Sequence, residues 1–299
     1  VIRSINNSVA VTSTSLFSVA LLTSSTQTMS EDELVKKINF FISLIEASSD
    51  YKDIWITQRE VKDMISKTEK LGFIKPTLIA SKKVYRPTSD EVATLSFYKN
   101  NIAHVFILYS LICESLKFVK KASKEEIVKL IEMIHPIFAK DFHLKNEIIT
   151  QESIGDAIDI LKNKGVLMAD DDGNVMAPLE NSIVFQDYVA LSNLCEPSLK
   201  RFYIVMNTIW KNETILKDDL NIKCKKLAED LEKIEGWPYP EFSDKAKFDN
   251  FVYMMKETKF FKEDKEGRLS ASKITKRAKK LYDQFFDKDF LEFIERQAN

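Results

Sequence analysis

Few side chains in this sequence have types and spacings suited to chemistry, and the three histidines come first. Asn100, Asn101 and His104 fall within one turn of a helix, so they can hydrogen-bond together or hold a polar partner against an apolar face. Two interpretations of His104 stay open: a hydrogen-bonded core histidine that orients one helix against another, and one wall of a ligand pocket. His135 and His143 have no pair of carboxylates or cysteines at metal-ligand spacing nearby, which favours structural roles.

Other motifs that would identify an active site are missing. The sequence has no nucleophile-elbow serine, no glycine-rich nucleotide loop and no His-Glu-x-x-His helix. Asp170 to Asp172 and Gly173 lack the spacing and final glutamate of a calcium loop, so a hairpin turn explains them better. The three cysteines, Cys113, Cys195 and Cys224, are far apart and indicate reduced thiols. We therefore expect no metal site, no cofactor and no catalytic residue in this chain.

Composition favours a helical protein. The chain has 299 residues, 44% hydrophobic and 30% charged, with only 6 glycines and 7 prolines. Its 44 basic and 45 acidic residues nearly cancel, which argues against a dedicated nucleic-acid binder. The longest apolar stretch, Ile102 to Cys113, is shorter than the ~20 residues needed to cross a bilayer. A start at Val1, without a methionine or a signal peptide, indicates a fragment, and the lysine-rich composition favours a bacterial source.

An internal repeat shows which elements hold these residues. Thr57 to Ile74 aligns without gaps on Thr150 to Leu167, and each copy ends near a glycine, Gly72 or Gly165, where a helix C-cap needs a left-handed residue. A hairpin is predicted after each glycine. A third copy is indicated by Phe248 to Thr258 and the sequence FFKEDKEGRLSAS that follows. Between the first two copies, a long helical run is predicted from residue 89 to residue 119.

This order of elements is the winged-helix pattern: other helices come first, then a helix that ends at a glycine, then a two-stranded hairpin. We predict a mainly α fold: a helical region containing two or three winged-helix-like units with short β-hairpins, at about residues 31–88 and 123–178. Acidic residues on the second copy would repel phosphates in a major groove, so a scaffolding role is favoured over DNA binding. These residues are Glu152, Asp156 and Asp159.

The break at Gly236 to Pro240 predicts two domains. The first is a helical body over residues 1–235, and the second is a basic amphipathic helical tail over 241–299 with a possible third wing. The tail's basic run fits an anionic bilayer surface or a solvated helix face, and nearby acidic residues favour the solvated face. The run consists of Lys273, Lys276, Arg277, Lys279 and Lys280.

Two segments resemble one family. Ile5 to Leu22 (INNSVAVTSTSLFSVALL) resembles the stretch that follows the catalytic domain of glycerol-3-phosphate and dihydroxyacetone-phosphate acyltransferases. Leu95 to Leu111 (LSFYKNNIAHVFILYSL) resembles a helix of the same family that carries the motif Tyr-Tyr-Arg/Lys-Asn-Asn with a histidine after it, and here Phe97 replaces the first of the two aromatic residues. The order and spacing of both segments also match.

This resemblance implies the carboxy-terminal, non-catalytic part of a glycerol-3-phosphate O-acyltransferase, which acylates the sn-1 hydroxyl in the first step of phospholipid synthesis. The family's catalytic His-x-x-x-x-Asp motif lies upstream of the matched region, and no histidine here has an aspartate five residues later. The fragment alone is therefore expected to be inactive. The choice between glycerol 3-phosphate and dihydroxyacetone phosphate stays open.

The resemblance also implies partners. They are the upstream acyltransferase domain of the same polypeptide and, through it, glycerol 3-phosphate and acyl-CoA or acyl carrier protein. A membrane surface is a further expected partner, nucleic acid is not, and the expected location is peripheral, on the cytoplasmic face of a bacterial inner membrane. The alternative is a tandem winged-helix module that contacts DNA or a protein. Substrate-cleft or inter-domain contact is expected at the motif residues Tyr98, Lys99, Asn100, Asn101 and His104.

Overall fold

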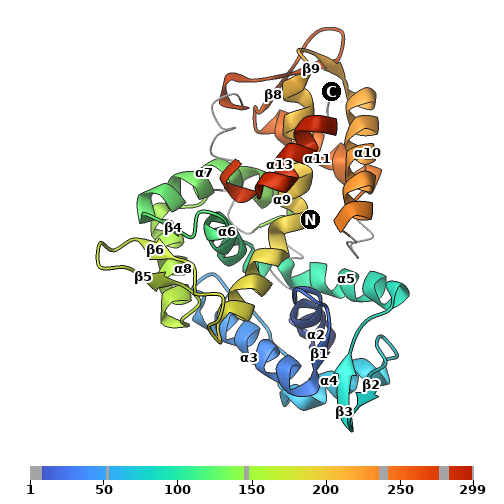
Figure 1. The fold of residues 1–299 in the computed structure, drawn as a ribbon, viewed down its shortest axis with the longest axis vertical. Coiled ribbons are helices and arrows are strands. Elements are labelled where there is room, and N and C mark those ends of the chain that lie inside the picture. The colour runs from blue at the N-terminus through green and yellow to red at the C-terminus, as the bar shows by residue number, and fades with distance from the viewer. Residues whose placement is uncertain (1–8, 52–53, 145–147, 236–241, 276–282, 298–299) are drawn as a thin grey trace.

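The computed structural model is mainly helical with small antiparallel sheets, as predicted (Figure 1). The first helix among the described residues, α2 (Ser13–Leu22), is buried along its whole length and begins with a reciprocal cap between Thr12 and Ser15. Small residues allow α2 to pack closely against both α4 (Val61–Lys70) and α5 (Ser89–Ala103). The structure describes residues 9–51, 54–144, 148–235, 242–275 and 283–297.

One order of elements occurs three times in the described part of the chain: a strand, two helices and a hairpin. In each sheet the first strand pairs with the third, which pairs with the second, all antiparallel. The first unit is β1 (Met29–Ser30), α3 (Glu31–Ala47), α4, β2 (Thr77–Ile79) and β3 (Lys82–Tyr85). The second is β4 (Lys121–Ala122), α7 (Lys124–Asp141), α8 (Gln151–Asn163), β5 (Met168–Ala169) and β6 (Val175–Met176). The third is β7 (Ile215–Leu216), α10 (Lys217–Glu235), α11 (Lys245–Glu257), β8 (Phe261–Glu263) and β9 (Arg268–Ala271).

A helix precedes each unit: α2, α6 (Ile107–Leu116) and α9 (Phe185–Lys211). Figure 1 shows the first unit at the bottom, the second at the left and the third at the top, with α9 running through the molecule between them. The hairpins predicted after Gly72 and Gly165 are present, and both glycines have φ of +74°. The third predicted hairpin is present as β8 and β9.

The long helix predicted over residues 89–119 is interrupted. A 3-10 turn, η1 (His104–Phe106), separates α5 from α6, and α6 ends at Leu116. The predicted boundary at residues 236–240 lies outside the described residues. On its two sides, α10 packs against α11, and β7 pairs with β9. Of the basic run, only Lys273 is described.

The described C-terminal elements, η2 (Asp283–Phe285) and α13 (Lys288–Gln297), dock on α9. Tyr203 of α9 donates a hydrogen bond of 2.8 Å to the Asp283 carboxylate. Its ring also lies against Phe286 and Phe290, at centroid distances of 4.7 and 5.6 Å. Aromatic packing around a hydrogen-bonded tyrosine therefore fixes this end of the chain to α9, the helix that precedes the third unit.

A buried ionic network joins α6 to α9. The Lys117 ammonium lies 2.9 Å from a carboxylate oxygen of Glu196 and 3.5 Å from one of Glu114, while Lys200 lies 3.1 Å from Glu196. Ser192 donates a hydrogen bond to Glu114. Because Glu114 is only 1% exposed, burial raises the pKa of its carboxyl to about 7, against the opposing effect of Lys117.

Candidate functional site

The motif residues expected to make a contact lie on α5 and η1, on two sides of the helix. Lys99 and His104 are buried, Tyr98 is half-buried, and Asn100 and Asn101 are exposed. Helix α5 starts with a reciprocal cap between Thr88 and Glu91 and packs on α2, which fixes this distribution. The buried and exposed members therefore face different surroundings. The two asparagines lie at the surface, and His104 lies inside the fold.

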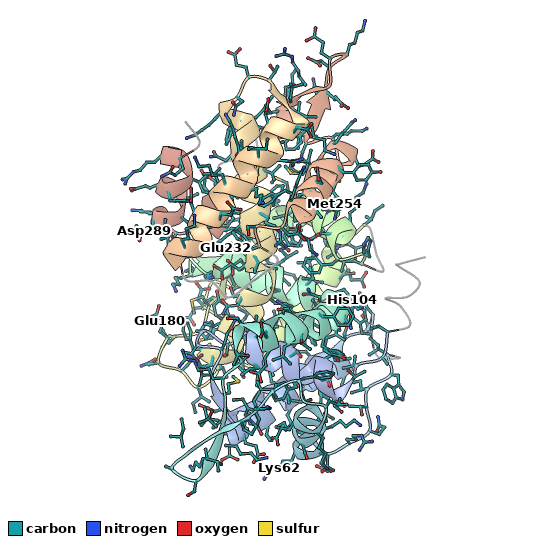
Figure 2. The ribbon with its side chains drawn as sticks, turned by 90° about the vertical axis from the view of Figure 1, so that its right-hand side faces the viewer. Lys62, His104, Glu180, Glu232, Met254 and Asp289 are labelled. Atoms are coloured by element: carbon teal, nitrogen blue, oxygen red, sulfur yellow. The ribbon has the colours of Figure 1, made fainter. Side chains whose placement is uncertain are left out.

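His104 lines a small cavity of about 70 Å³ between the first and second units. Figure 2 labels His104 near the middle of the long axis of the molecule, above the elements of the first unit. The cavity also takes in His135, Tyr51 and Tyr109. The Tyr51 hydroxyl donates to the His104 carbonyl at 3.4 Å, and the two rings lie edge to face at a centroid distance of 6.0 Å. His104 is thus a buried residue that also lines this cavity.

Chemistry in this cavity is limited by its size and by its hydroxyl groups. Burial raises the pKa of both Tyr51 and Tyr109, and the carboxylate of Asp50 adds to the rise, so both phenols stay protonated at neutral pH. A volume of about 70 Å³ holds a few water molecules, at roughly 10–15 Å³ of such volume for each. The cavity is therefore suited to ordered water between two packed units.

A second, larger hollow lies at the surface where α2 begins. This groove, which we call the α2 groove, has a volume of about 370 Å³. It is formed by the start of α2, the segment before α4, the outer face of α4, and Tyr98 of α5. The lining residues are Thr12, Ser13, Thr14, Trp55, Thr57, Arg59, Lys67, Leu71 and Tyr98.

The α2 groove brings together the two segments that carry the family resemblance. A parallel bridge between Val11 and Ile56 holds two of its lining segments together: the Val11 amide donates to the Trp55 carbonyl at 2.8 Å, and the Thr57 amide donates to the Val11 carbonyl at 3.0 Å. Thr12 follows directly and caps α2. Sequence reasoning named Tyr98 but missed the rest of the groove, because this bridge joins residues far apart in the chain.

Two negative observations concern the described residues only. They contain no cluster of three or more histidine, cysteine or acidic side chains that would hold a metal ion. Among them there is also no helix with both the length and the apolarity to cross a bilayer.

Comparison with known sequences identifies the family. The sequence model of the family described as "Glycerol-3-phosphate acyltransferase C-terminal region" matches residues 1–264 of the chain. The chain belongs to this family. This match includes both Ile5 to Leu22 and Leu95 to Leu111, so it confirms the family resemblance of these two segments.

Curated relatives agree. The C-terminal region is 29% identical over 276 residues to a protein of Alteromonas mediterranea named glycerol-3-phosphate acyltransferase, covering 91% of this chain. A protein of the same name from Pseudoalteromonas atlantica is 26% identical over 274 residues, and one from Pseudomonas paraeruginosa is 20% identical over 273, each covering 90% of this chain. The chain spans about a third (33%) of the length of these relatives.

Proposed function

We propose that this C-terminal region is a non-catalytic part of a glycerol-3-phosphate O-acyltransferase and braces an acyltransferase domain that precedes it in the same polypeptide. That polypeptide would transfer an acyl group from acyl-CoA or acyl carrier protein to the sn-1 hydroxyl of glycerol 3-phosphate. One observation carries the proposal: the family match covers residues 1–264, and no histidine in the sequence precedes an aspartate at the spacing of the family's catalytic motif.

The face around the α2 groove is our choice for the contact with that domain. Trp55 is 58% exposed in the groove, and Leu71, the C-cap residue of α4, is exposed in the same groove. Phe97, 62% exposed, lies against the ring of Tyr98 at a centroid distance of 5.4 Å. Large apolar side chains gathered at one surface gain free energy when a partner covers them. Of the motif residues, we assign Tyr98, Asn100 and Asn101 to this contact. Lys99 and His104 would support it from inside the fold.

The three repeated units support a scaffold. Their shared order of strand, two helices and hairpin, and their shared strand pairing, favour a winged-helix-like unit in each case, including the third, which spans the proposed boundary after residue 235. The rival function as a DNA-binding module is disfavoured by α8, whose exposed residues include Glu152, Asp156 and Asp159. A peripheral position at the cytoplasmic face of a bacterial membrane is part of this proposal.

The test is an activity measurement on a longer polypeptide. This chain alone should show no acyl transfer to glycerol 3-phosphate, whereas the chain joined to its native upstream segment should transfer the acyl group to the sn-1 position. Product regiochemistry, read by mass spectrometry after lipase digestion, distinguishes sn-1 from sn-2 transfer. An inactive, folded full-length protein would contradict the proposal.

The contact face has its own test. In the full-length protein, Trp55→Ser and Phe97→Ser should lower activity or loosen the two parts, seen as faster proteolysis between them. Tyr253→Ser is the matched control, because Tyr253 is an aromatic residue 58% exposed on α11, remote from the groove. Equal behaviour of all three variants would remove this face from the proposal.

A further inference from the structure

The hairpin of the first unit has an apolar tip. We call β2, β3 and the turn between them the first wing. The residues from Thr77 to Ser81 form its tip, and all of them are exposed and uncharged. Within the tip, Leu78 is 71% exposed and Ile79 is 58% exposed. Large aliphatic side chains that stand side by side in water gain free energy when another molecule covers them.

The other two hairpins carry charges at the same place in the fold. Acidic residues form their turns: Asp170 to Asp172 between β5 and β6, and Asp264 and Glu266 between β8 and β9. The carboxylates of Asp170 and Asp264 each accept two backbone hydrogen bonds inside their own turns. These two tips are suited to water. Because the three units share one order of elements, the apolar tip is a property of the first unit and not a requirement of the hairpin.

The tip of the first wing is apolar on both of its faces. Successive residues of a strand point to opposite faces, so Leu78 and Ile79 lie on opposite sides of the ribbon. Both are exposed, so no other part of the described chain covers either face. Figure 1 shows β2 and β3 at the bottom end of the long axis of the molecule. A flat protein surface would cover one face of such a ribbon, whereas a medium that surrounds the tip covers both.

The base of the first wing is fixed to the rest of its unit. On α4, the Glu69 carboxylate accepts hydrogen bonds from the Tyr85 hydroxyl and from the Lys83 ammonium, the latter at 2.9 and 3.0 Å. On α5, the Glu91 carboxylate accepts the Lys75 amide at 3.1 Å. The acidic groups therefore engage the base and not the tip, and they hold the hairpin as a firm support for it.

Cations surround the tip on both arms of the first wing. Lys75, Lys82 and Arg86 are exposed, and none of them forms an ion pair with any residue that the structure describes. Lys82 pairs in register with Ile79, directly beside the turn. A lysine in this position can lay its aliphatic stem along an apolar layer while its ammonium reaches phosphates above that layer. An apolar tip with cations behind it complements the surface of an anionic bilayer.

We propose that the first wing inserts its tip into the surface of an anionic lipid bilayer. Leu78 and Ile79 enter the boundary between head groups and acyl chains, and Lys75, Lys82 and Arg86 bind lipid phosphates. The proposal rests on the peripheral membrane position proposed above, and it names the element and the lipid charge that produce this position. The third unit, at the opposite end of the long axis, lies away from the bilayer (Figure 1).

Vesicle binding tests the proposal on the 299-residue chain, without any acyl donor. The chain should sediment with vesicles of phosphatidylcholine and phosphatidylglycerol, bind phosphatidylcholine alone more weakly, and lose affinity as salt is added. An environment-sensitive dye on Ser81→Cys should shift its emission to the blue when vesicles are added. The dye reacts selectively there, because Cys113, Cys195 and Cys224 are buried. The same dye on Asp171→Cys, in the second hairpin, should not shift.

Variants locate the contact. Leu78→Ser and Ile79→Ser should each weaken vesicle binding about tenfold, as expected when one aliphatic side chain no longer leaves water. Met168→Ser is the matched control, because Met168 is 44% exposed on β5 of the second hairpin, and it should leave binding unchanged. Lys82→Gln should weaken binding to phosphatidylglycerol vesicles several-fold and reduce its dependence on salt.

Two results would overturn the proposal. One is a folded chain that does not bind phosphatidylglycerol vesicles, and this result would also remove the peripheral membrane position. The other is vesicle binding by Leu78→Ser and Ile79→Ser equal to that of the unchanged chain, with folding confirmed by circular dichroism. If these variants also lower the activity of the full-length protein, the tip enters a slot in a protein partner instead. The bracing function is judged separately, by acyl transfer in the longer polypeptide.

Discussion

Gly165 and Lys259 occupy the same place in two successive units: each comes directly after the C-cap of the helix that leads into a hairpin, and each has a positive φ, +74° and 64°. Glycine accepts this left-handed conformation readily, whereas a side chain with a Cβ is strained by roughly 1 kcal/mol. Gly72 holds the equivalent position in the first unit. The third unit therefore keeps the backbone of the repeat without its glycine.

Replacing Lys259 by glycine should stabilise the chain. Lys259→Gly relieves the positive-φ strain and is expected to raise the free energy of unfolding by about 0.5–1 kcal/mol, since the gain is partly offset by the greater freedom of glycine in the unfolded chain. Lys259→Ala removes the same side chain but keeps a Cβ, so it should give no gain. Urea midpoints of both variants measure the difference, and equal midpoints would refute the explanation.

The opposite change should destabilise the first unit. A Cβ on Gly72 would meet no atom within 4 Å, so the cost of Gly72→Ala is conformational, at about 1 kcal/mol. Gly155→Ala tests a different mechanism, because its Cβ would lie 2.8 Å from the flexible end of Lys124 and φ is not positive there. We expect Gly72→Ala to lower the urea midpoint more, and the reverse order would contradict the assignment.

The turn between β2 and β3 gives a second local prediction. Ala80 and Ser81 are the two residues between the strands, with φ of 48° and 63°. Such a turn normally takes Asn-Gly, because both positions need positive φ. The double change Ala80→Asn with Ser81→Gly should raise the free energy of unfolding by about 1 kcal/mol and slow hydrogen exchange of the β2–β3 amides. No change in that exchange would count against the turn geometry.

Local rules explain what was predictable from sequence. The helix ends at Gly72 and Gly165 were predictable, because a helix end of this kind depends on the backbone conformation of a single residue, which glycine adopts readily. The first strand of each unit was missed, since β1, β4 and β7 are two residues long and too short to show alternation. The third unit was less clear because Lys259 replaces the glycine signal.

The candidate site was predicted only in part, for a different reason. Tyr98 and His104 were named together, yet Tyr98 lines the α2 groove and His104 lines the cavity between units. The cations of the groove were not noticed, because Arg59 and Lys67 belong to a segment that also contains the acidic residues Glu60 and Asp63. The packing of α4 against α2 places Arg59 and Lys67 in the lining of the groove but not Glu60 and Asp63, and this packing cannot be read from the sequence.

An ion pair between α3 and α9 offers a test of how the first unit is held. Lys37, 5% exposed, pairs with Asp187 and donates to the Gln186 carbonyl at 2.7 Å. Asp187→Asn leaves the buried ammonium without its counter-charge and should lower the free energy of unfolding by about 1–3 kcal/mol. This is less than for a fully buried pair, because the Asp187 side chain is 27% exposed and water screens its charge. Adding Lys37→Met should recover part of the loss, as a double-mutant cycle of urea midpoints would show.

A surface pair serves as the control for that cycle. Arg296 and Glu292 lie 2.8 Å apart on α13, with both side chains more than half exposed. Glu292→Gln should change the free energy of unfolding by less than about 0.5 kcal/mol. If Asp187→Asn lowers the free energy of unfolding by no more than Glu292→Gln does, the buried ammonium of Lys37 does not need Asp187 as its counter-charge.

The last prediction concerns pH and the buried Glu114. Its pKa in the fold is about 7, above the ordinary value of 4.5, so the folded state holds this proton more tightly than the unfolded state. Protonation therefore favours folding: the contribution is fully present below about pH 4.5 and is lost as pH rises to about 7. The full loss is on the order of 3.5 kcal/mol, because the pKa rises by about 2.5 units and each unit corresponds to about 1.4 kcal/mol.

Glu114→Gln isolates this effect, because glutamine resembles the protonated acid and can still accept the hydrogen bond from Ser192. The free energy of unfolding of the variant minus that of the unchanged chain should rise by about 2 kcal/mol between pH 5 and pH 8. Glu229→Gln, on an exposed pair with Lys225, should give a flat difference over the same range. A flat difference for Glu114→Gln as well would mean that Lys117 keeps Glu114 ionised in the fold across this pH range, and would contradict the raised pKa.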